Sequence, residues 1–193
     1  RVPVGIHSHN DVGCAVANAM AAVEAGASQV QGTYIGFGER CGNCNLSTII
    51  PNLQLKKGYR CSPQEMLLRL TSTARYISEV ANLRLPANLP YVGKSAFAHK
   101  GGMHVDGVYK NSISFEHIDP EAVGNSRQVL LSEFSGRSAI AARMAEIDST
   151  VTRDSQVAGE LVEDLKHLEY EGYTFESADA SFEIFALKHL GKY

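Results

Sequence analysis

The order of apolar and polar positions at the start of the chain predicts a strand, a helix and a second strand. Residues 2–6 are apolar and β-branched, which is typical of a strand. Residues 14–25 are rich in alanine, with larger apolar side chains three to four positions apart, as on one face of a helix. Residues 29–33 predict another strand. A strand, a helix and a strand in about 35 residues form a βαβ unit, so we expect parallel strands with a right-handed crossover.

Beyond residue 46 the pattern predicts helices. Residues 62–65 have the sequence of a capping box, with Pro63 at the first helical position, and residues 83–94 predict a linker. After the capping box an apolar stripe predicts one helix from its members Met66, Leu67, Leu70, Ala74, Ile77 and Val80. Further along we expect a glycine-broken segment at 95–110, a turn at 119–120, a strand at 128–131, and helices near 137–146, 154–170 and 179–190.

Composition limits the class of protein. The chain has 193 residues, of which 44% are hydrophobic and 20% charged, as in one soluble domain or two at most. The net charge of −3 argues against a nucleic-acid partner, and the lack of a long apolar run argues against a membrane span or secretory signal. We therefore predict a cytoplasmic protein with reduced thiols. Cys41 and Cys44 have redox or zinc-site spacing, but unpaired thiols are the favoured interpretation.

Charge is divided unevenly along the chain. Residues 1–100 carry ten basic and five acidic side chains, and residues 101–193 carry eight and sixteen. The basic half could attract an anionic small molecule, although solvated faces of opposite sign explain the division equally well.

Two histidines at the end of the first strand form a candidate metal site. His7 and His9 are two positions apart, so their side chains lie on one face of a strand and could hold one ion together. Asn10 and Asp11 add an amide and a carboxylate; Asp11 could cap the next helix or hold a ligand histidine by a hydrogen bond. The alternative is that the histidines satisfy hydrogen bonds in the core.

Two later segments also carry candidate chemistry. Gly36, Gly38 and Gly42 surround Glu39 and Arg40, which suggests backbone held close to a ligand, or else a mobile loop with a surface ion pair.

The second of these segments has histidines at 99 and 104 beside paired glycines. With Lys100 and Asp106, they could serve acid/base chemistry near an anion, or form the exposed face of a helix start.

Taken together, these motifs closely resemble the metal-dependent acyl-CoA condensing enzymes that include isopropylmalate, homocitrate and citramalate synthases. The bacterial citramalate synthase branch is the most similar. The motifs that carry the resemblance lie at residues 7–13, 15–18, 24–27, 36–43, 50–55, 90–93, 96–102, 117–120 and 135–138.

The resemblance implies an α/β fold, in which residues 1–60 are the last two βα units of a TIM (β/α)8 barrel. Mainly α-helical linker subdomains would occupy residues 61–150, and residues 151–193 would lead to a C-terminal regulatory domain that the chain does not contain. Barrels of this type need about 250 residues. We therefore expect a carboxyl-side portion of a longer chain, which a strand near the first residue and the missing initiator Met also favour.

The resemblance also implies roles for individual residues. A homodimer is implied, in which a histidine of one subunit completes the partner's active site. An aspartate ligand, an arginine and a catalytic glutamate of the family would lie upstream of Arg1. The roles implied for residues of this chain are metal binding by His7, His9 and Asn43, catalysis by His104, substrate binding by Gly36, Gly38 and Glu39, and support of a ligand histidine by Asp11.

The implied reaction joins acetyl-CoA to the 2-oxo acid pyruvate, with a divalent metal (Mg, Mn or Zn), in branched-chain amino-acid biosynthesis. The alternatives are a 2-isopropylmalate or homocitrate synthase, a related barrel lyase, and a dimerising fragment that is inactive by itself. One position departs from the family pattern, because Phe115 stands where most relatives have a tyrosine. We expect the missing hydroxyl to be dispensable here.

Overall fold

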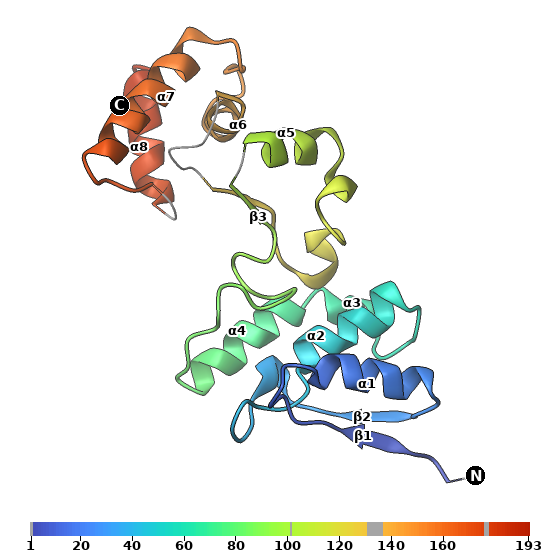
Figure 1. Cartoon of the computed structure of the whole chain (residues 1–193). Helices are drawn as coiled ribbons and strands as arrows, with labels where there is room; N and C mark the ends of the chain where they lie inside the picture. The colour runs from blue at the N-terminus through green and yellow to red at the C-terminus, as the bar shows by residue number, and fades with distance from the viewer. Residues whose placement is uncertain (1, 101, 131–136, 176–177) are drawn as a thin grey trace. The chain divides into compact units, whose positions relative to one another are not determined.

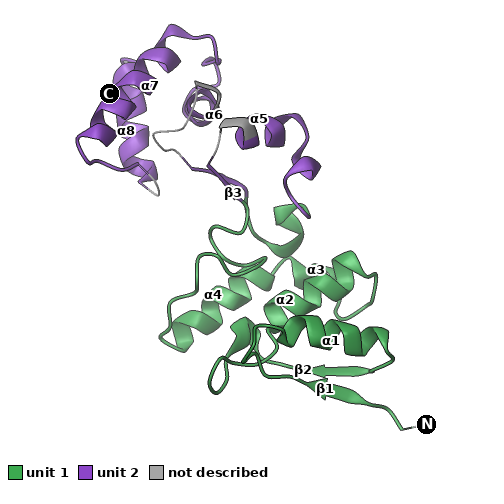
Figure 2. Cartoon of the chain, viewed as in Figure 1, with its two compact units in different colours: residues 1–97, 118–126 green, residues 98–117, 127–193 purple. Residues whose placement is uncertain are grey.

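The computed structural model describes residues 2–100, 102–130, 137–175 and 178–193. The chain forms two compact units, the first made of residues 1–97 and 118–126 and the second of residues 98–117 and 127–193 (Figure 2). In the part of the chain that is described, no helix combines the length and apolar character that a membrane crossing requires.

The first unit begins with the predicted βαβ arrangement. Strand β1 (Gly5–His7) pairs in parallel with β2 (Gln29–Gln31), and α1 (Ala15–Glu24) connects them and packs against both (Figure 1). Both strands are shorter than expected, and Val2 and Val4 lie exposed before β1. The parallel pairing confirms the predicted unit. It also places the carboxyl ends of β1 and β2 side by side.

Helical segments follow β2. A short 3₁₀ turn, Tyr34–Gly36, leads to α2 (Leu46–Pro51), whose first turn is capped because the Asn45 side chain accepts a hydrogen bond from the Ser47 amide. A π-helical segment, Asn52–Lys56, continues α2. The core beneath α1 and α2 consists of Ala15, Ala19, Cys44, Ile49 and Leu53.

The helix predicted after residue 62 is wrong in its start and its continuity. The capping box does not form, because both the amide and the hydroxyl of Ser62 donate to the Gln54 side chain instead. The helix is divided into α3 (Gln64–Leu67) and α4 (Leu70–Val80). The division interrupts the apolar stripe, so that Met66 and Val80 are exposed while Leu67, Leu70 and Ala74 are buried.

The predicted linker at 83–94 is partly core. Tyr91 and Val92 are buried, and the Asn125 side chain donates to the carbonyl oxygens of Tyr91 and Gly93. Asn125 belongs to residues 118–126, which return to this unit with the 3₁₀ turn Pro120–Val123. The sequence pattern did not predict this return.

The second unit contains a small parallel pair and four helices among its described residues. The helices near 137–146, 154–170 and 179–190 are confirmed, whereas Leu131 of the predicted strand, Gly101, and Ser135 and Gly136 of the family motif lie outside the described residues. The last three helices share a core that includes Met144, Leu161 and Phe182. The elements are β3 (Ala98–His99), α5 (Gly102–Lys110), β4 (Gln128–Val129), α6 (Arg137–Ile147), α7 (Gln156–Tyr170) and α8 (Asp179–His189) (Figure 1).

Candidate functional site

Two loops meet at the carboxyl ends of β1 and β2, and we call residues 8–14 and 32–45 the site loops. Main-chain hydrogen bonds join them: the Asn10 amide donates to the Gly42 carbonyl at 2.8 Å, and the Cys44 amide donates to the Ser8 carbonyl at 2.9 Å. Between these bonds, His9 forms an antiparallel bridge with Asn43. The parallel β1–β2 pair therefore brings together residues more than thirty positions apart.

The predicted metal ligands lie at this junction. The rings of His7 and His9 are edge to face, with centroids 5.2 Å apart, and both side chains are exposed. The Oδ1 atom of Asn43 is buried and has no hydrogen-bond donor among the described residues. A buried carbonyl oxygen without a donor is costly, and a divalent cation would satisfy it. Two imidazoles and this amide oxygen therefore fit part of a metal shell.

The described residues do not form a metal site from acidic and cysteine side chains. Among them, no group of three His, Cys, Asp or Glu residues is close enough to hold an ion. A metal held by His7, His9 and Asn43 would need at least one more ligand from outside this set.

The glycines of the second site loop make room for the loop itself. Gly42 has a φ of 84°, and a Cβ atom there would overlap the carbonyl oxygen of Gly36. At Gly38 a Cβ atom would lie 2.6 Å from Nδ2 of Asn43. A side chain at Gly42 would therefore force the loop backbone apart, and one at Gly38 would displace the Asn43 amide. The side chain of Glu39 is 87% exposed, so it stands open to solvent.

Asp11 and Arg40 add a salt bridge between the two site loops. Arg40 Nε donates to Asp11 Oδ2 at 2.9 Å, and both side chains are about half exposed. The N-cap residue of α1 is Cys14, and the amide of Ala15, the first helical residue, donates to the Asn10 side-chain oxygen at 3.2 Å, so the predicted cap at Asp11 is wrong. Among the described residues, the Asp11 carboxylate binds Arg40 and makes no hydrogen bond to a histidine. Its support of a ligand histidine stays a prediction.

In the second unit, His104 lies exposed on α5 against an aromatic ring. The ring centroids of His104 and Phe115 are 4.8 Å apart and tilted by 35°. Gly107 lies three positions after His104 on the same helix face, and a Cβ atom there would overlap the Phe115 ring. Two other residues predicted for acid/base chemistry have different surroundings. The Asp106 carboxylate forms an ion pair with Lys110 at 2.6 Å, and the His99 side chain is buried.

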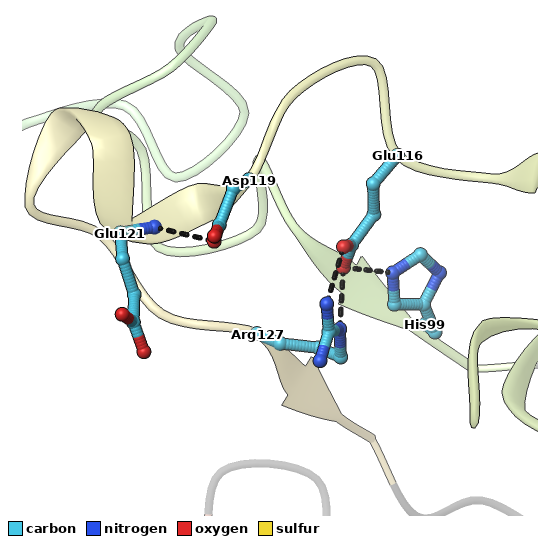
Figure 3. A network of polar contacts seen from close by, with 5 residues as sticks. All are labelled: His99, Glu116, Asp119, Glu121 and Arg127. Carbon is cyan, nitrogen blue, oxygen red and sulfur yellow. Dashed lines mark hydrogen bonds and ion pairs between the residues drawn. The ribbon is translucent and has the colours of Figure 1, made fainter. Parts of the chain in front are cut away.

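A buried carboxylate that the sequence pattern did not reveal, Glu116, follows α5 along the chain. The Glu116 side chain is only 3% exposed; it accepts from Arg127 Nε at 2.7 Å and Nη2 at 2.6 Å, and from His99 Nε2 at 3.0 Å (Figure 3). The Arg127 hydrogen bonds, with help from His99, hold the pKa of Glu116 below its usual range, although burial opposes them. No local pattern could have joined three residues this far apart in sequence.

Comparisons with known proteins match both parts of the chain. Residues 1–77 match the HMGL-like family, and residues 91–172 match the family described as homocitrate synthase post-HMGL domain-like. The chain is 50% identical over 188 residues to the (R)-citramalate synthase of Aquifex aeolicus, covering 97% of this chain and 36% of that protein. The Synechocystis (R)-citramalate synthase is also 50% identical, with 97% and 34% covered.

A 2-isopropylmalate synthase is more distant. The enzyme of Cronobacter sakazakii is 43% identical over 153 residues, which cover 76% of this chain and 28% of that protein. The chain spans about a third of the length of the curated relatives it matches.

Proposed function

We propose that this chain contributes to an (R)-citramalate synthase, because residues 1–77 match the HMGL-like family and residues 91–172 match the homocitrate synthase post-HMGL domain-like family. The enzyme would condense acetyl-CoA with pyruvate. In the structure, the observation that carries the proposal is the unsatisfied Asn43 oxygen beside two exposed histidines. Similarity to (R)-citramalate synthases along 97% of the chain supports this choice of substrate.

The family implies a TIM barrel, and the described structure is α/β with helices. We assign residues 1–60 to the last two βα units of such a barrel, residues 61–150 to helical linker subdomains, and residues 151–193 to the approach to a regulatory domain. The parallel β1–α1–β2 unit supports the first assignment, because βα units of this kind build the barrel. We also propose a cytoplasmic homodimer in which His104 serves the partner's active site.

His7, His9 and Asn43 would hold the metal, which could be Mg, Mn or Zn. When bound, such an ion supplies Lewis-acid polarisation of the 2-oxo acid carbonyl. His7 ends β1, and the site loops hold His9 and Asn43; the main-chain bonds between the loops would fix the spacing of these donors before any ligand arrives. We place Gly36, Gly38 and Glu39 along the pocket of the substrates.

His104 would move the proton that the condensation requires. A ring nitrogen of its exposed imidazole would take a proton from the methyl group of acetyl-CoA. The carbanion formed then attacks the carbonyl carbon of pyruvate, and the resulting alkoxide takes up a proton. Water finally cleaves the thioester, which releases CoA and makes the sequence irreversible.

Release of the CoA thiol tests the proposal. The full-length protein would be assayed with acetyl-CoA and, in turn, pyruvate, 2-oxoisovalerate and 2-oxoglutarate. We expect pyruvate-dependent release that His7→Ala or Asn43→Ala abolishes, and that the matched control His167→Ala leaves intact, because His167 lies exposed on α7. A preference for 2-oxoisovalerate or 2-oxoglutarate would overturn the citramalate assignment, and release with none of the three would overturn the synthase itself.

A further inference from the structure

The buried Glu116 cluster takes no part in the chemistry proposed above. It joins three residues that are distant in sequence, and each comes from a different place around α5. His99 is the last residue of β3, before the helix, and Glu116 lies seventeen positions after His99, beyond the end of the helix. Arg127 immediately precedes β4, the parallel partner of β3. The cluster is therefore the base of the segment that carries His104, residues 102–115, which we call the histidine arm.

A continuous series of contacts leads from this base to His104. Phe115 is the residue directly before Glu116, and its ring packs against His104. The same ring covers Gly107, where the absence of a side chain lets it rest on the helix backbone. A shift of Glu116 would move Phe115 and with it the surface against which the His104 imidazole rests.

The chemistry of the cluster argues for a role beyond stability. Burying a carboxylate costs solvation free energy, and apolar residues of similar volume are often as stable as a buried ion cluster or more so. An ion cluster also fixes the orientation of its side chains, because a bidentate Arg–carboxylate pair holds both partners in one geometry. In Glu116, both oxygens are engaged by Arg127, and one of them also by His99 (Figure 3).

We propose that Glu116 is a positioning residue that, through Phe115, sets the orientation of the His104 imidazole for proton transfer. The proposal rests on the proposed function, in which His104 is the proton-transferring residue. Glu116 acts through its bonds to His99 and Arg127 and touches no substrate.

The test uses the full-length protein and three variants. Glu116→Gln removes the charge. The triple variant His99→Leu, Glu116→Leu, Arg127→Met replaces the whole cluster with apolar side chains, so it leaves no buried charge unpaired if the single variant fails to fold. Lys110→Gln is the matched control, because it breaks an exposed ion pair on α5. Circular dichroism and thermal unfolding select the variants that are folded.

Two readouts separate positioning from a purely structural role. The first is the ¹³Cε1 signal of His104 in histidine-labelled protein, assigned with His104→Gln and followed against pH without substrate. The second is the division of any loss between kcat and KM. In the folded cluster variants we expect a displaced His104 signal and a kcat reduced by about 10- to 100-fold with KM for pyruvate little changed, since small misplacements of a reacting group cost up to about 100-fold. Lys110→Gln should alter neither.

A folded triple variant with an unchanged His104 signal would overturn the proposal, as would an unchanged kcat in an active enzyme. The His104 signal needs no turnover, so it still decides the positioning role if the wild-type protein makes no citramalate. A wild-type protein that makes no citramalate would overturn the proposed function and leave the positioning role to be decided by the His104 signal.

Discussion

The site loops and the histidine arm each carry an exposed histidine, but different interactions fix its position. The site loops do so with main-chain hydrogen bonds and glycines packed at close range, whereas the arm depends on one buried carboxylate bound by side chains. Hydrogen bonds between main-chain groups do not change with pH or with most side-chain substitutions. A buried ion cluster, in contrast, is destabilised when any one of its members is removed. The two regions should therefore fail under different changes.

The largest effect is expected from Gly42→Ala in the site loops. The new Cβ would overlap the Gly36 carbonyl at a positive φ, so the loop must open, at a cost of about 3 to 5 kcal/mol of unfolding free energy. Urea unfolding measures this cost, and titration with Mn²⁺ should show at least about 10-fold weaker binding.

Gly58→Ala is the matched control for that change. Gly58 also has a positive φ, 73°, but nothing lies within 4 Å of a Cβ built there. It should cost only about 1 kcal/mol, the strain of the left-handed conformation alone. Equal losses in the two variants would show that the close packing at Gly42 contributes nothing.

At the base of the histidine arm, Glu116→Gln should lower the unfolding free energy by about 2 to 3 kcal/mol. The Arg127 guanidinium loses its charged partner, and partial exposure of Arg127 keeps the cost below that of a fully buried pair. Lys110→Gln, measured by the same urea unfolding, should change the free energy by less than about 0.5 kcal/mol. If Glu116→Gln matched Lys110→Gln, the cluster would not hold the arm.

Low pH should distinguish the two regions without any mutation. The pKa of Glu116 is lowered from its ordinary value of 4.5, so the folded state binds this proton less tightly than the unfolded state does. The stabilisation is therefore complete above about pH 4.5 and is lost as the pH falls through the lower pKa of the folded protein. Asp148, whose pKa Lys192 and Thr150 lower, acts in the same direction, and Asp148→Asn removes its share. In unfolding measured from pH 7 to pH 3, the difference in unfolding free energy between wild type and Glu116→Gln should narrow as the pH falls below about 4.5.

The smallest effect is expected at Arg40. Arg40→Gln removes an exposed salt bridge to Asp11, which is worth at most about 1 kcal/mol and is screened by salt. Mn²⁺ affinity should change less than about threefold, since the main-chain bonds remain. A loss as large as that of Gly42→Ala would mean that the side-chain bridge, not the backbone, holds the loops together.

Local patterns predicted the parts of the fold that depend on local physics. The βαβ unit and the last three helices were foreseen because period and glycine stops report on a segment's own structure. The predicted capping box does not form, because Ser62 donates instead to the side chain of Gln54, eight positions away. The segment predicted as a linker contains buried residues, and Asn125, more than thirty positions later, donates hydrogen bonds to its carbonyl oxygens.

The candidate site divides in the same way. His7 and His9 were recognisable because two positions on one strand share a face. Asn43 came from the family resemblance, and its buried oxygen emerged only from the structure. Glu116 carried no signal, because its partners lie seventeen and eleven positions away in other segments of the chain, and local helix or strand patterns do not report contacts between segments.

Hydrogen exchange tests the contrast between the two regions most directly. Full-length protein would be exchanged at pH 7 and near pH 3.5, and amide protection would be corrected for the intrinsic rate at each pH and compared between peptides covering residues 32–45 and 102–117. We predict that acid leaves protection of the site loops unchanged and lowers that of the histidine arm, with no further loss in Glu116→Gln. Equal acid sensitivity of both peptides, or a protected arm at low pH, would contradict the account.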